Sequence, residues 1–115
     1  MNWTAIASLF LAAAVGLGAF GAHALKDRLD AYSLGIWEKA VFYHFVHALG
    51  MLLASTLTPR KDLVCWLLTA GILLFSGSLY ALALTGTRVL GAVTPFGGVA
   101  FIAAWVLLAI QASRN

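Results

Sequence analysis

Three histidines are the residues of this 115-residue chain with the most versatile chemistry, and they lie near the ends of two apolar stretches. His23 closes the first stretch, and His44 and His47 follow in the second, after one short polar loop. An imidazole can change its charge near physiological pH and can bind a metal ion. A functional site is therefore expected where the end of the first apolar stretch and the start of the second face each other across this loop.

The spacing of His44 and His47, three residues apart, places both on one face of a helix. Together with His23 they could bind a proton, a small ligand or a metal ion. Haem would need His23 as one axial ligand, because two histidines on the same helix face cannot lie on opposite sides of one iron. The structural alternative is that shallow imidazoles hydrogen-bond a neighbouring helix or reach lipid headgroups. We predict no cofactor, and the sequence leaves the metal question open.

The composition of the chain determines which elements must position these histidines. Hydrophobic residues make up 63% and charged residues 10%, against about 45–50% and 25% in an ordinary soluble domain. A backbone N–H or C=O group without a hydrogen bond is costly in lipid, so only helices and closed β-barrels span a membrane. The chain lacks the alternating pattern of barrel strands, which leaves helices. A spanning helix takes about 20 residues. Four uncharged runs are at least that long: residues 1–25, 40–59, 63–87 and 89–113.

The predicted fold is all-α, an integral membrane four-helix bundle with an antiparallel up-down-up-down order. Short connections join the helices, and Thr94-Pro95 resembles an N-cap followed by the first-turn proline of a helix. The whole chain, 1–115, is predicted to form one transmembrane domain with an interfacial segment at about 26–39. The helices are expected at about 3–25, 40–57, 63–84 and 95–112.

Antiparallel order places the polar residues of all four helices in one half of the membrane. The end of the first helix, the start of the second, the end of the third and the start of the fourth meet there. Hydroxyl groups from the third helix are expected beside the histidines, and Thr94 opens the fourth. The predicted ligand-binding residues are His23, His44, His47, Ser76, Ser78 and Tyr80.

Several other classes of protein fit the sequence poorly. A cleaved signal peptide would carry a Lys or Arg before its apolar core, and that core would be only ~7–15 residues long. The formal charge of +3 is better explained by interfacial anchors than by nucleic-acid binding, so the lipid bilayer is the expected partner. Cys65 is the single cysteine and forms no internal disulfide. Three Lys and Arg residues are expected on one side of the membrane and four on the other, and an excess of these residues normally marks the cytoplasmic side. The counts therefore do not determine the orientation.

Four blocks of the sequence resemble the YgdD/YwdK-like family of small membrane proteins. They are GAFGAHAL at 18–25, Tyr43-His44 with His47-Ala48-Leu49, FSGSLY at 75–80 and TPFGG at 94–98. The resemblance covers nearly the whole chain, and relatives occur in bacterial inner membranes and in animals. It implies a four-helix membrane protein without an established biochemical activity, placed in the bacterial plasma (inner) membrane.

These observations favour a non-catalytic accessory, assembly or lipid-contacting subunit, because no nucleophile, base and acid occur together and no phosphate-binding loop is present. Such a subunit would form a homo-oligomer or bind another membrane protein. The first alternative is a ligand-binding or proton-handling protein that uses the histidines and hydroxyl groups of one membrane half. The second is a small-solute transporter, which would need an oligomer because one bundle offers little polar lining.

Overall fold

The computed structural model describes residues 1–114, and every regular element in that range is helical. The predicted all-helical class is therefore confirmed. The elements are α1 (Trp3–Phe20), η1 (Gly21–Leu25), α2 (Ala31–Ala54), α3 (Asp62–Gly71), η2 (Ile72–Ser76), α4 (Gly77–Thr85), η3 (Arg88–Ala92) and α5 (Thr94–Ser113). Consecutive helical elements join end to end into continuous helices, which we call rods: α1–η1, α2, α3–η2–α4 and α5. The first and third rods each contain a π-helical segment.

Three helical stretches of the described chain are long and apolar enough to cross a membrane: Trp3–Leu25, Asp62–Thr85 and Arg88–Ser113. Helix α2 does not meet the same standard, although it has 24 residues. It carries Glu38, Lys39 and two histidines, which lower its mean hydropathy. Its length is sufficient, but its composition differs from that of the other three rods.

Helix α2 begins at Ala31 rather than at residue 40, so most of the segment expected at the interface is part of a long helix. The side chain of Asp30 caps this helix by accepting a hydrogen bond from the Ser33 amide at 2.7 Å. The charges of Glu38 and Lys39, at the end of the predicted interfacial segment 26–39, are typical of the edge of a membrane span. A helix, however, tolerates charges at its end, and the cap at Asp30 determines where it begins.

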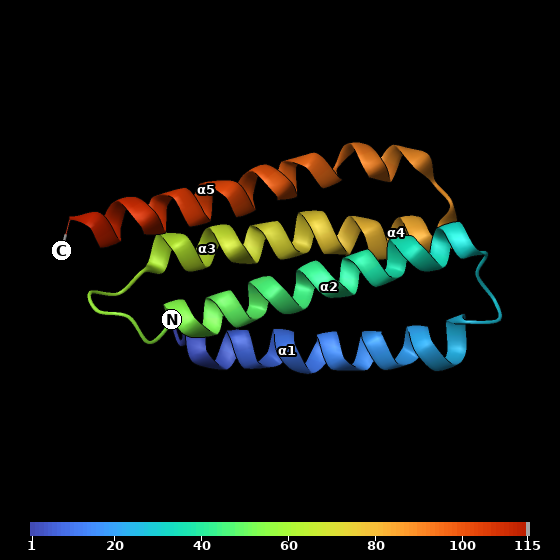
Figure 1. The fold of residues 1–115 in the computed structure, drawn as a ribbon, viewed down its shortest axis with the longest axis horizontal. Coiled ribbons are helices and arrows are strands. Elements are labelled where there is room, and N and C mark those ends of the chain that lie inside the picture. Colours follow the sequence, from blue (N-terminus) through green and yellow to red (C-terminus); the bar gives the residue numbers. More distant parts are fainter. Residues whose placement is uncertain (115) are drawn as a thin grey trace.

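The rods lie side by side along the 50 Å axis of the molecule (Figure 1). Helix α1 packs against α2, α2 packs against the continuous rod α3–η2–α4, and that rod packs against α5. Helices α1 and α5 therefore form the two outer members of the row. The turn between α1 and α2 lies at one end with η3, and the N-terminus and the α2–α3 loop lie at the other end (Figure 1).

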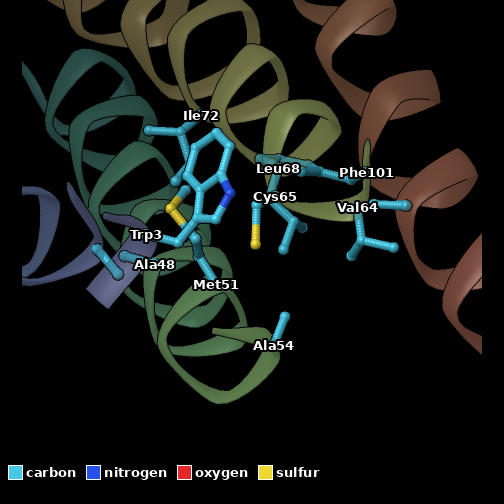
Figure 2. Close-up of a cluster of buried hydrophobic side chains, with 11 residues drawn as sticks. Trp3, Ala48, Met51, Ala54, Val64, Cys65, Leu68, Ile72 and Phe101 are labelled. Atoms are coloured by element: carbon cyan, nitrogen blue, oxygen red, sulfur yellow. The ribbon is translucent and has the colours of Figure 1, made fainter. Parts of the chain in front are cut away.

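The largest buried apolar cluster lies near the N-terminal end of α1, and Figure 2 shows its side chains converging from several rods. Trp3 from α1 is 4% exposed, and its indole nitrogen donates to Oδ1 of Asp62 at 2.7 Å. Alanines such as Ala7 and Ala48 are fully buried and allow neighbouring backbones to approach closely. This end of the molecule is thus held by close packing around one tryptophan.

Candidate functional site

His44 connects three rods at the middle of the predicted polar layer. Its side chain is 3% exposed, and its Nδ1 atom lies 2.8 Å from the hydroxyl oxygen of Tyr80 on α4. Its ring meets Phe10 of α1 edge to face, with centroids 6.0 Å apart. The second ring nitrogen, Nε2, is buried without a hydrogen bond of normal geometry, although the backbone carbonyl of Phe10 lies beside the imidazole.

The surroundings of His44 favour one tautomer. If the Tyr80 hydroxyl donates to Nδ1, then Nε2 carries the proton and turns an N–H toward the Phe10 carbonyl. In the opposite arrangement Nε2 would be a bare acceptor beside another acceptor. Because the first arrangement is the lower in energy, His44 is best described as a neutral imidazole protonated at Nε2, with a weakly satisfied donor.

Tyr80 and Trp37 extend this contact toward the end of α1. Their ring centroids are 4.7 Å apart, and Trp37 donates from its indole nitrogen to the carbonyl of Leu17 at 2.9 Å. A Cβ atom at Gly21 would lie 2.5 Å from the Trp37 ring. The absence of a side chain at this glycine, the first residue of the π-helical η1, therefore allows α1 to lie over Trp37.

His47 faces a different neighbour. Its Nδ1–H donates to the carbonyl of Tyr43, one turn earlier in the same helix, at 2.8 Å. Its ring stacks on Phe101 of α5, with centroids 3.5 Å apart and an interplanar angle of 11°. It is 6% exposed. His44 thus contacts α1 and α4, whereas His47 contacts α5, and no hydrogen bond joins the two.

The predicted serines also join helix to helix. Ser76 is fully buried and donates to the carbonyl of Ala40 on α2 at 2.8 Å. The hydroxyl oxygens of Ser78 and Thr94 are 2.6 Å apart, which links α4 to the start of α5. Both residues satisfy their hydroxyl groups within the protein.

His23 stands apart from the other predicted site residues. It is exposed on η1, and no hydrogen bond or aromatic contact connects it with His44 or His47. Within residues 1–114, no three His, Cys, Asp or Glu side chains come together as metal ligands. The six predicted residues therefore form separate helix-to-helix pairs and one exposed imidazole, and they do not form a common ligand shell.

Several aromatic residues of this layer were not among the predicted site residues. Trp37 on α2 is only 2% exposed. Trp105 on α5 packs where a Cβ at Gly50 would lie 2.4 Å from its ring. Glycines on the facing rods were the signal available in the sequence, since each of these two tryptophan rings lies against one of them.

Comparison with known proteins gives a consistent family. Residues 17–98 match the family described as "Protein of unknown function (DUF423)". A UPF0382 membrane protein of Staphylococcus saprophyticus is 52% identical over 101 residues, covering 84% of each chain. The UPF0382 membrane protein YwdK of Bacillus subtilis is 46% identical over 107 residues, covering 88% of this chain and 87% of the relative. No solved structure matches the chain.

These findings confirm the predicted resemblance and the predicted location. The relatives are named membrane proteins and come from bacteria, which agrees with a plasma-membrane location, and three stretches of the chain are suited to cross a membrane. The chain belongs to the DUF423 family, and its bacterial relatives are named UPF0382 membrane proteins.

Proposed function

We propose that this protein is an integral membrane bundle whose four rods cross the bilayer in antiparallel order and that it acts as a non-catalytic accessory, assembly or lipid-contacting subunit. One observation carries the proposal. The buried polar side chains that could do chemistry are mostly engaged in bonds between helices, as in the pairs His44–Tyr80 and Ser78–Thr94. Groups used in this way hold a bundle together and are not free for a substrate.

The outer surface supports the same proposal. Large apolar side chains are exposed along the outer rods and also along α2, where Phe42 is 62% exposed. A soluble monomer rarely exposes more than a few hundred Å² of contiguous apolar surface, but hydrocarbon solvates such side chains well. Other strongly exposed residues include Leu9, Val15, Leu73, Phe96, Val99 and Ile102.

Helix α2 is proposed as the fourth crossing although it is the most polar of the rods. With 24 residues it is about 36 Å long at 1.5 Å per residue, and the hydrocarbon layer is about 30 Å thick. Its histidines are buried against other rods. Glu38 and Lys39 lie in the first half of the helix and are exposed, where long side chains can reach the headgroup region.

The topology can be tested with single cysteines in a Cys65→Ala background. Thr56→Cys and Ala112→Cys should react with a membrane-impermeant maleimide from one side of the membrane, and Thr87→Cys from the other. All three positions are exposed, so reactivity reports sidedness rather than burial. Labelling of Thr56→Cys and Thr87→Cys from the same side would contradict a crossing by α3–η2–α4. Labelling of Asp27→Cys, in the turn before α2, from the same side as Thr56→Cys would contradict a crossing by α2.

The accessory role requires a protein neighbour, which we propose to be a second copy of this chain or another membrane protein. Extraction into polymer-bounded native nanodiscs, followed by mass photometry, should give a particle larger than one chain with its lipid. A particle of one chain, combined with no cross-linked neighbour in the membrane, would contradict this role.

A proton-handling function is the second candidate, because the Nε2 atom of His44 is buried without a regular partner while Nδ1 faces a hydroxyl group. This arrangement could pass a proton between the Tyr80 hydroxyl and the interior of the bundle. Proton flux into proteoliposomes that Tyr80→Phe abolishes would favour this candidate. Equal flux for the unaltered protein and for empty liposomes would exclude it.

A further inference from the structure

A cleft of about 770 Å³ opens at the end of the molecule where the α1–α2 turn and η3 lie. The start of α2 forms one wall, and the end of α4 together with η3 forms the other. Ile36 and Leu82 contribute apolar surface to it. None of the polar layer around His44 and His47 lines this cleft, so it is separate from the site described above.

Two opposite charges line the cleft without neutralising each other. The side chain of Arg88 is exposed on η3 and makes no hydrogen bond or ion pair with residues 1–114, in which the single ion pair joins Arg60 and Asp62. Asp30 uses Oδ1 to cap α2 through Ser33. Those bonds lower the pKa of Asp30, so its carboxylate is charged at neutral pH. The cleft thus offers one cationic and one anionic contact on opposite walls.

The depth of the cleft indicates what could reach it. Its lining includes Leu82 in the last turn of the apolar stretch Asp62–Thr85 and Arg88 at the first residue of Arg88–Ser113, so the cleft lies at the ends of these stretches. In a bilayer this is the level of the headgroups, where tyrosines also gather. Tyr32, which is 76% exposed, lines the cleft and supplies a hydroxyl group there.

From this geometry we propose that the cleft binds a zwitterionic phosphoethanolamine group, the headgroup of an amine-bearing phospholipid. The guanidinium of Arg88 pairs with the phosphate, and the carboxylate of Asp30 accepts hydrogen bonds from the ammonium. A purely anionic headgroup leaves Asp30 without a partner and meets its repulsion. A choline headgroup has no N–H to donate. The inference deepens the proposed lipid-contacting role and rests on the same placement in the membrane.

Lipid selectivity of the full-length protein tests this site. In mixed micelles, native mass spectrometry should show binding of dioleoyl phosphatidylethanolamine in preference to the matched phosphatidylcholine and phosphatidylglycerol. Because the three lipids share the phosphate, the contact between Asp30 and the amine alone should set the preference, which we expect to be roughly fivefold for an exposed charge pair. Equal occupancy by the three lipids would overturn the proposal.

Two variants separate the two contacts. Arg88→Gln should weaken binding of both phosphatidylethanolamine and phosphatidylglycerol, because both carry the phosphate. Asp30→Asn keeps a good N-cap residue and should reduce only the preference for the amine. Arg114→Gln and Asp27→Asn remove the same charges at exposed positions that do not line the cleft, and they should leave selectivity unchanged. Equal effects of Arg88→Gln and Arg114→Gln would contradict the assignment.

The source of the headgroup and the membrane placement are tested in the same series. Soluble glycerophosphoethanolamine that competes with the lipid, with the same dependence on Arg88, would extend the site to free ligands. Failure to compete would restrict it to lipids. Alkaline carbonate extraction reports membrane integration by itself. Resistance to extraction together with absent lipid selectivity would overturn the cleft and leave the proposed function standing.

Discussion

The two ends of the helical rods are held together by different means. Near the N-terminus, Trp3, Met51 and the residues around Cys65 fill a close-packed apolar cluster with few polar atoms (Figure 2). Farther along, toward the α1–α2 turn, a smaller apolar cluster around Trp37 is accompanied by hydrogen bonds between rods, such as that from Ser76 to the Ala40 carbonyl. The comparison shows that polar side chains deep in this protein can add to packing in holding the helices together, so their presence alone does not indicate catalysis.

The largest effect is expected where two rods approach most closely. A Cβ at Gly97 would lie 2.3 Å from the backbone nitrogen of Phe75, and backbone cannot move aside as a flexible side chain can. Gly97→Ala should therefore destabilise the fold by about 3 kcal/mol or more, measured by thermal unfolding in detergent. Gly16 has no neighbouring atom within 4 Å. An equal loss in Gly16→Ala would contradict the explanation.

A smaller but still large effect is expected in the apolar cluster. Met51 is fully buried, and Met51→Ala leaves a cavity there. In lipid, burying an apolar side chain between helices gains no transfer free energy from water, so that part of the loss is absent. The loss of packing around the cavity remains, and we expect it to cost about 2 kcal/mol. Unfolding in mixed micelles measures it. Leu53→Ala on the same helix is the control, since Leu53 is 63% exposed, and it should cost much less.

The polar end should respond more weakly to the loss of a single bond. Tyr80→Phe removes the hydroxyl group that faces His44 at 2.8 Å, and hydrogen bonds between membrane helices average about 0.6 kcal/mol with a maximum near 1.7. We expect about 1 kcal/mol, because the bond is partly buried. Thr4→Val removes an exposed hydroxyl pair with Ser55 at the other end and should change stability less. A larger loss for Thr4→Val would reverse the comparison.

The smallest effect concerns pH and the cap of α2. The bonds from Ser33 lower the pKa of Asp30 in the folded protein. A carboxyl group whose pKa is lower in the folded than in the unfolded protein stabilises the fold above the unfolded pKa, which is near 3.9. This stabilisation is lost as the pH falls through the folded pKa. Unfolding curves below about pH 4 should therefore show a small acid loss that Asp30→Asn removes. An unchanged acid slope in this variant would indicate that other carboxylates cause the loss.

The sequence was sufficient to predict the helical class, the three most apolar stretches and the family. It did not predict the start of α2, because the charges of Glu38 and Lys39 masked a helix whose cap lies at Asp30. It also suggested a cluster that included His23, which the structure leaves exposed on η1. The direction in which each imidazole points depends on contacts between distant rods, such as Phe101 against His47, and helical spacing cannot supply these.

The central claim is that the buried polar layer holds the rods together, and a double-mutant cycle between His44 and Tyr80 tests it most directly. The unfolding free energies of His44→Leu, Tyr80→Phe and the double variant should give a coupling energy of about 0.5–1.5 kcal/mol. Losses that simply add, with no coupling between the two side chains, would show that this pair does not stabilise the bundle and would contradict the account.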